Sequence, residues 1–333
     1  MFNIPIALFI FKRAEKSVKI VEQIAKAAPQ RFYIVSDAGR NEEEKAIVDA
    51  CRRAVEGAVT WDCEVVKLYA EENLGCHNIG MSAMKIFETE KSCIFLEDDN
   101  FPSDSFFAYC KEMLERYEDN DDILWVCGTN YMNTYAPQDG SDYVFTQHML
   151  PCGWASWSKK FNKYYEYDFE HLNEAGIAKA KKSYKSQRLF RYDLNNWQSE
   201  VRNKAAQGRY ASWDYHMNFS LRVHNKLGIA PRYNQITNIG VDSFSAHGGK
   251  SMENYLTNKF CMVPNKALQF PLKHPSEIKI DSKFEKATEK IIVPPRSYYL
   301  KIAIRRMIPI PRDISIKKSL KAGKIVRKGN KAK

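Results

Sequence analysis

Three consecutive carboxylates follow a short apolar run in the first third of the chain. Residues 93–96 read CIFL, and Glu97, Asp98 and Asp99 come directly after them. A continuous apolar run of this length is typical of a strand buried on both faces, as in a parallel sheet. The acids then lie at the carboxyl end of that strand, where open α/β sheets bind ligands. Because clustered carboxylates suit Mg²⁺ or Mn²⁺, the sequence predicts a divalent-cation site here.

A plainer interpretation is a solvated acidic turn before a helix with Asp104 as its N-cap. Packing three acids together raises their pKa values unless a cation lies among them. Their position after a buried strand therefore favours the metal.

Two other strand ends carry polar groups, Arg13 and Asp37. The carboxyl ends of parallel strands meet at one edge of a sheet, so these groups and the acids could share a nucleotide. The alternatives, a surface charge for Arg13 and a plain turn residue for Asp37, remain open. The chain has no GxGxxG and no GxxxxGK[ST], which argues against a dehydrogenase or a P-loop kinase.

The elements that must position these groups alternate along the first half. Strands are expected at 4–11, 31–36, 64–69, 93–96 and 123–127, with helices at 17–28, 42–55, 78–88 and 105–117. Ser17 is the expected cap of the first helix. Four strand–helix repeats predict an α/β fold with a mostly parallel sheet flanked by helices. The second half, rich in aromatics, has expected helices in 171–209 and from Asp214 to about residue 225.

The charge of the chain is concentrated in a basic tail. Of the net +11, residues 294–333 contribute +12, with thirteen Lys and Arg against Asp313, so the remaining 293 residues sum to −1. A near-neutral body argues against a nucleic-acid-binding fold. The tail mixes basic and apolar residues, which predicts association with an anionic membrane surface. Nucleic-acid binding is the rival interpretation, and a solubilising disordered tail is the plain alternative. The expected divisions are 1–130, 131–293 and 294–333.

The cysteines and the amino terminus indicate the compartment. Eight cysteines are scattered without a CxxC pair, as expected in a reducing cytosol. The apolar run at 4–11 is too short for a membrane span, and its charges follow it, unlike those of a signal peptide.

The ordered set of motifs resembles the GT-A glycosyltransferases, most closely bacterial nucleotide-diphospho-sugar transferases of the N-acetylglucosaminyltransferase I type. The likeness covers about residues 4–250. It includes Asp37, NLGC (73–76), FLEDD (95–99), GWASW (153–157), WDY (213–215), TNIGVD (237–242) and SAHGG (245–249). In that family the EDD triplet is the DXD-type motif that binds metal and sugar nucleotide.

The resemblance implies roles for residues on the donor side. Asp99 would hold Mn²⁺ or Mg²⁺, and His247 would be a late metal or phosphate ligand, although a lone loop histidine is more often solvated. The remaining contacts would be Glu97 and Asp98 to the sugar or ribose, Asp37 to the base, Arg13 to the diphosphate, and the Asn73 to Gly75 turn to the nucleotide. The pattern departs from the family after NLGC, where this chain has His77 and similar sequences have a basic residue.

On the acceptor side, Asp214 resembles the general base of inverting members, and a helix N-cap is its plain alternative. Trp154 and Trp157 would stack on an acceptor sugar, or form a core aromatic pair.

The function that the resemblance implies is a metal-dependent, inverting glycosyltransferase of bacterial surface polysaccharide or lipopolysaccharide synthesis. It would use a nucleotide-diphospho-sugar, UDP-sugar favoured, and a glycan or lipid-linked glycan acceptor at the cytoplasmic face of the inner membrane. Two alternatives remain. A sugar-phosphate nucleotidyltransferase would normally have a Gly-rich basic loop where residues 11–17 read FKRAEKS, and a non-catalytic carbohydrate-binding protein would not need the acids.

Overall fold

The computed structural model describes residues 2–242, 252, 255–295 and 297–298. The chain divides into two units, Met1–Glu289 and Lys290–Lys333. His247 and most of the expected basic tail, 294–333, therefore lie outside the described residues. The strands and helices belong to the first unit, except that the last helix ends at Ile292, within the second.

An eight-stranded sheet forms the centre of this unit, in the order β3-β2-β1-β4-β8-β6-β9-β7. Only β8 and β7 run against the other strands. This confirms the predicted fold class, a mostly parallel, Rossmann-like α/β sheet. The strands are β1 (Ile6–Ile10), β2 (Arg31–Ser36), β3 (Glu64–Tyr69), β4 (Ser92–Glu97), β6 (Ile123–Cys127), β7 (Tyr143–Thr146), β8 (Trp154–Trp157) and β9 (Leu227–Pro231).

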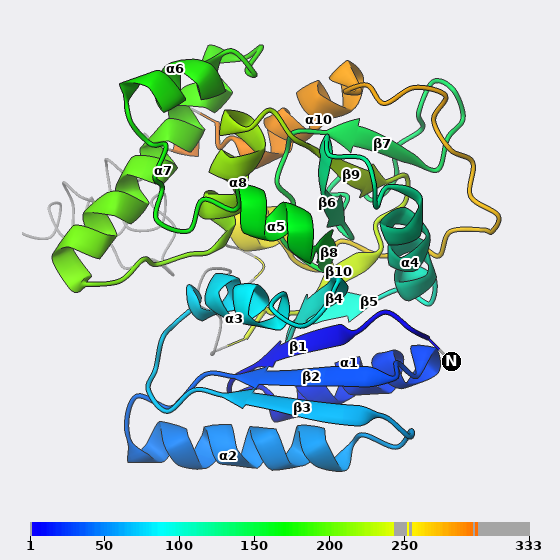
Figure 1. Ribbon diagram of the computed structural model, residues 1–333, viewed down its shortest axis with the longest axis vertical. Helices are drawn as coiled ribbons and strands as arrows, with labels where there is room; N and C mark the ends of the chain where they lie inside the picture. The colour runs from blue at the N-terminus through cyan, green and yellow to red at the C-terminus, as the bar shows by residue number, and fades with distance from the viewer. Residues whose placement is uncertain (1, 243–251, 253–254, 296, 299–333) are drawn as a thin grey trace, which may run out of the picture. The chain divides into compact units, whose positions relative to one another are not determined.

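Helices flank the sheet, as the alternation of apolar runs predicts. Figure 1 shows α2 beside β3 at one end of the sheet, with β7 at the other end. The helices are α1 (Ala14–Ala27), α2 (Glu42–Gly57), α3 (Asn78–Ile86), α4 (Phe106–Arg116), α5 (Ser158–Tyr164), α6 (Glu174–Lys181), α7 (Gln187–Gln207), α8 (Asp214–Val223), α9 (Tyr255–Phe260) and α10 (Ser282–Ile292).

The first helix begins three residues earlier than predicted. Arg13, not Ser17, occupies the N-cap position of α1. The Ser17 hydroxyl is buried and donates a hydrogen bond to the Arg13 carbonyl oxygen at 2.8 Å. The expectation that Ser17 caps the helix was therefore wrong, and the earlier start places Arg13 at the carboxyl end of β1.

A second, two-stranded sheet joins distant segments beside β4. β5 (Asn100–Pro102) pairs antiparallel with β10 (Ile236–Asn238), and the Ile239 amide donates to the Asp99 carbonyl oxygen at 2.8 Å. This pairing brings the segment 236–242 to the end of β4, where the acids lie.

Candidate functional site

The three acids lie at the carboxyl end of β4, as predicted. Glu97 is the last residue of the strand and pairs in register with Phe9 of β1. Arg13 follows β1 at the same edge of the sheet, and its Nη1 donates to Asp98 Oδ1 at 2.6 Å and to Asp99 Oδ2 at 3.1 Å. The side chains of Arg13, Asp98 and Asp99 are 12%, 10% and 16% exposed, so this ion cluster is largely shielded from water.

The electrostatics of the cluster are those of crowded, buried carboxylates. Burial, followed by the charges of Asp99, Asp98 and Asp214, raises the pKa of Glu97 well above its usual value. Burial raises the pKa of Asp98 to about 6, although the Arg13 charge opposes the shift. Burial also opposes the charged form of Arg13, but the carboxylates of Asp98 and Asp99 outweigh this and raise its pKa. The acids therefore depend on nearby positive charge.

Asp99 is fixed by groups from both strands of the small sheet. Its Oδ1 accepts hydrogen bonds from Asn100 Nδ2 at 2.7 Å and Asn238 Nδ2 at 3.3 Å. Gly240 approaches from the same segment, and a Cβ at that position would lie 2.3 Å from Asp99 Oδ2. Only glycine fits beside this carboxylate without displacing it.

The sequence reasoning missed two charged residues at this site, Asp242 and Lys16. Asp242 Oδ2 lies 3.1 Å from Arg13 Nε and also contacts Lys16 Nζ, which donates to the Ile239 carbonyl oxygen at 2.6 Å. Asp242 is the last residue of the TNIGVD motif. Nothing local in the sequence linked it to Arg13, which is 229 positions away.

Asp37 holds the NLG turn in place. Its Oδ1 accepts from the amides of Ala38 and Leu74 at 2.9 and 2.8 Å, and its Oδ2 accepts from the Gly75 amide at 2.8 Å and from Asn73 Nδ2 at 3.0 Å. All three predicted nucleotide-side residues, Asp37, Asn73 and Gly75, are thus brought together. Both carboxylate oxygens of Asp37 already accept hydrogen bonds within the chain.

A basic residue does lie beside the NLG turn, although it comes from a distant segment of the chain. Arg209, in the connection between α7 and α8, donates from Nη1 to the Asn73 carbonyl oxygen at 2.8 Å and is exposed. His77 is instead buried, with the rings of Tyr167, Tyr210 and His216 at 5.0, 5.0 and 5.4 Å. Sequence order alone could not identify Arg209 as the neighbouring base.

Asp214 lies at the start of α8, in reach of the same acids. The N-cap position belongs to Trp213, and the Ser212 hydroxyl donates to Asp214 Oδ1. The N-cap alternative for Asp214 therefore does not hold. The Asp214 charge raises the pKa of Glu97, and burial, followed by the charges of Glu97, Asp214, Asp37 and Asp99, raises the pKa of the Cys76 thiol to about 12. The negative charges of Glu97, Asp214, Asp37 and Asp99 thus all act on the Cys76 thiol.

The carboxylate oxygens at the end of β4 are suitable ligands for a divalent cation. No hydrogen bond or ion pair from the described residues reaches the Glu97 carboxylate, which lies among three other acids. Oxygen ligands with excess negative charge are what Mg²⁺ and Mn²⁺ bind. The contribution of His247 falls outside the described residues.

The structure places both predicted acceptor tryptophans in the core. Trp154 is 1% exposed and stacks with Phe95 and Trp125 at 3.9 and 4.3 Å. Trp157 is 3% exposed and donates from Nε1 to the Leu114 carbonyl oxygen at 2.9 Å. Both side chains are almost fully buried and belong to the core, as the core alternative expects.

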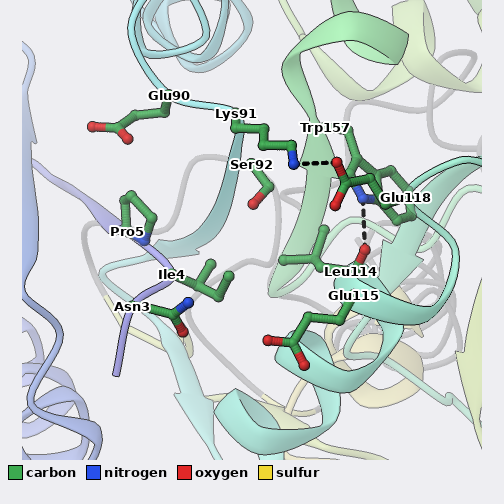
Figure 2. Close-up of a pocket in the computed structure, with 10 residues that line it drawn as sticks. All are labelled: Asn3, Ile4, Pro5, Glu90, Lys91, Ser92, Leu114, Glu115, Glu118 and Trp157. Atoms are coloured by element: carbon green, nitrogen blue, oxygen red, sulfur yellow. Dashed lines mark hydrogen bonds and ion pairs between the residues drawn. The ribbon is translucent and has the colours of Figure 1, made fainter. Parts of the chain in front are cut away.

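A surface pocket lies at the other end of β4 from the acids. Figure 2 shows Ser92, the first residue of β4, in its wall, together with Pro5 and Trp157. Its volume is about 330 Å³, and the ion pair between Lys91 and Glu118 crosses its rim. None of the acids of the candidate site lines this pocket, so we do not assign nucleotide-sugar binding to it.

No protein-family model and no curated protein matches the chain. Among solved structures, it is similar to S. aureus TarS 1-349, at 9% identity and a TM-score of 0.37 over 70% of this chain and 59% of that one. It is also similar to mannosyltransferase PcManGT from Pyrobaculum calidifontis in complex with GDP-Man and Mn²⁺, at 10% identity and a TM-score of 0.37 over 67% and 70%. A third is 4-diphosphocytidyl-2C-methyl-D-erythritol synthase from Anaerococcus prevotii, at 9% and 0.32 over 53% and 82%. The chain thus matches less than two thirds of the TarS fragment, and at these scores the likeness says nothing about activity.

Proposed function

We propose that this chain is a metal-dependent, inverting glycosyltransferase that moves a sugar from a nucleotide-diphosphate donor to a glycan acceptor. The observation that supports this most strongly is the cluster of Glu97, Asp98 and Asp99 at the end of β4, where Arg13 binds the two aspartates and the charge of Asp214 acts on Glu97. The sequence resemblance assigns the first three to donor binding and the fourth to catalysis.

On the donor side, the chain would bind the nucleotide diphosphate between the acids and the NLG turn. Asp99 would hold Mn²⁺ or Mg²⁺, and Arg13 would contact the diphosphate by charge-assisted hydrogen bonds. When bound, the ion would neutralise charge on the departing diphosphate. Glu97 and Asp98 would contact the sugar or ribose, and the turn held by Asp37 would line the nucleotide pocket.

On the acceptor side, Asp214 would act as the general base. Its carboxylate would take the proton from the acceptor hydroxyl while that oxygen forms a bond to the anomeric carbon from the face opposite the donor phosphate. The bond from the anomeric carbon to the phosphate oxygen breaks, and the nucleoside diphosphate leaves with the electron pair. A positioned base of this kind contributes ~10²–10⁴-fold to the rate.

A UDP-sugar donor and a lipid-linked glycan acceptor of bacterial surface polysaccharide or lipopolysaccharide synthesis belong to the same proposal. The basic tail supports a location at the cytoplasmic membrane face, since each basic residue near anionic lipid contributes about 1 kcal/mol. Among the described residues, no helix is long and apolar enough to cross a bilayer. Deleting 294–333 should release the protein from anionic vesicles, and unchanged binding would contradict the tail's role.

Turnover of nucleotide sugars tests the catalytic proposal. Purified protein is incubated with UDP- and GDP-sugars and Mn²⁺, and release of nucleoside diphosphate is measured with water as acceptor. Asp214→Asn should lower this rate by ~10²–10⁴-fold. The matched control is Asp104→Asn, since Asp104 is exposed and pairs with Lys26.

A second assay, with a nucleoside triphosphate and a sugar phosphate as substrates, separates the alternatives. Pyrophosphate release from a nucleoside triphosphate and a sugar phosphate would identify a nucleotidyltransferase. Nucleotide binding without turnover would favour the non-catalytic protein.

A further inference from the structure

A second group of metal-ligating side chains lies on the segment that follows α5 and on the end of α8. Glu166 and His171 come from this segment, and His224 occupies the C-cap position of α8. His171 Nδ1 lies 2.6 Å from Glu166 Oε1, and His224 Nε2 lies 2.7 Å from the same oxygen. One ligand atom from each residue lies within 4.8 Å of the other two.

The carboxylate of this group is buried, although the group opens to solvent. The Glu166 side chain is 4% exposed, His224 is 16% exposed and His171 is 55% exposed. A buried carboxylate is costly unless a positive charge accompanies it. A cation bound between the carboxylate and the two imidazoles would supply that charge.

The helix adds a second, independent attraction for a cation. His224 stands at the carboxyl end of the ten-residue helix α8. The macrodipole gives that end partial negative charge, which favours positive charge there.

We propose that Glu166, His171 and His224 bind a Zn²⁺-type divalent cation through Oε1, Nδ1 and Nε2, with water completing the coordination. Two imidazoles and one carboxylate are a known zinc ligand set, and imidazole ligands suit Zn²⁺ better than Mg²⁺. Metal–ligand bonds of about 2.0–2.1 Å in a tetrahedron put ligand atoms roughly 3.4 Å apart. The two contacts of 2.6 and 2.7 Å need to open by less than ~1 Å to admit the ion.

The ion would fasten the segment after α5 to the helix that carries Asp214. The backbone of Glu166 already joins them: its amide donates to Ser220 Oγ at 2.9 Å, and its carbonyl oxygen lies 3.0 Å from His216 Nδ1. Asp214 is at the amino end of α8, about 15 Å along the axis from His224. The site is therefore structural, separate from the acids, and does not rest on the proposed function.

Cobalt and zinc binding test this site without any activity assay. Untagged protein carrying Asp99→Asn, which removes the main ligand at the acidic site, is titrated with Co²⁺ and followed by visible absorption, and Zn²⁺ affinity is measured by competition with a chromophoric chelator. The protein should bind one ion with the spectrum of tetrahedral Co²⁺. His171→Asn and His224→Asn should weaken Zn²⁺ binding by more than the ~10–100-fold that loss of an outer partner costs.

The matched control is His274→Asn, since His274 lies elsewhere and contacts Tyr143 and Glu112. It should leave the affinity unchanged. Because His171 is half-exposed, its replacement should not unfold the chain, which a melting curve verifies. No binding of micromolar Zn²⁺ by the parent protein, or equal affinity in His171→Asn, would overturn the proposal.

Discussion

Arg13 Nη1 lies 2.6 Å from Asp98 Oδ1, at a point where two parallel strands end side by side. The contact joins residues 85 positions apart, and the same nitrogen also reaches Asp99. Arg13 thus supplies positive charge to acids that burial would otherwise hold protonated.

Replacing Arg13 should therefore destabilise the protein. Arg13→Gln leaves buried carboxylates without their partner, which should lower the free energy of unfolding by about 3 kcal/mol in urea denaturation. Mn²⁺ should restore part of the loss, because a bound cation replaces the missing charge. Lys19→Gln is the control, since Lys19 pairs with Glu15 on the exposed side of α1 and should have no measurable effect. Equal stability of Arg13→Gln and wild type would contradict this role.

Gly75 should resist substitution for a backbone reason. Its φ is +74°, and a Cβ there would find only Arg209 Nη1 at 3.9 Å, so space is not the obstacle. Gly75→Ala should cost about 1–2 kcal/mol, the penalty for an L residue in the left-handed region. Gly57→Ala, at the end of α2 with open space around it, should be neutral or stabilising. Similar losses at both positions would refute the backbone explanation.

His216 should make the protein sensitive to acid. Burial lowers the pKa of His216 from 6.5 to about 3, because its ring is enclosed and Nε2 has no partner within the described structure. The folded state therefore binds its proton less readily than the unfolded state. The folded state is therefore favoured most when His216 is neutral in both states, above pH 6.5. As the pH falls from 6.5 towards 3, the free energy of unfolding decreases by up to about 1.4 kcal/mol per pH unit.

Urea denaturation of wild type and His216→Asn across this pH window tests the assignment. The variant should be less stable near neutrality but should lose less stability on acidification. Parallel pH profiles for the two proteins would show that His216 does not titrate in this way.

Trp157 should matter for stability and not for the acceptor. Trp157→Phe removes the hydrogen bond to the Leu114 carbonyl oxygen and weakens the contact with Lys160, whose Nζ lies 3.6 Å from the ring centroid. The expected loss is about 1–2 kcal/mol, with KM for any acceptor unchanged. A raised acceptor KM at unchanged stability would restore the sugar-stacking interpretation.

The sequence predicted the bounds of three strands of the main sheet correctly. β2, β3 and β6 have the predicted bounds, and β4 differs by one residue at each end. β2, β4 and β6 are buried apolar runs with polar neighbours, which leaves few other solutions, whereas β3 is a partly exposed edge strand. β8 was missed. Its four residues, WASW, are all buried between two strands that run the other way, and so short a segment carries no periodicity.

The sequence identified the acids of the candidate site, but it did not identify all of the residues that contact them or the NLG turn. The acidic triplet and Asp214 stand out by residue type, and strand order alone brings Arg13 near. Asp242 and Arg209 reach the site only through long-range folding, by the β5–β10 pairing and the turn at Asn73. Trp154 could be placed in the core only once its stack with Phe95 was visible.

Nucleotide binding with and without Mn²⁺ tests the central claim most directly. Calorimetry with UDP and GDP is performed on wild type, Asp99→Asn and the exposed control Asp104→Asn. The account predicts Mn²⁺-dependent binding of one nucleotide by wild type and Asp104→Asn, and its loss in Asp99→Asn. Binding that is independent of both Mn²⁺ and Asp99, or no binding by any protein, would contradict a metal-assisted donor site at the end of β4.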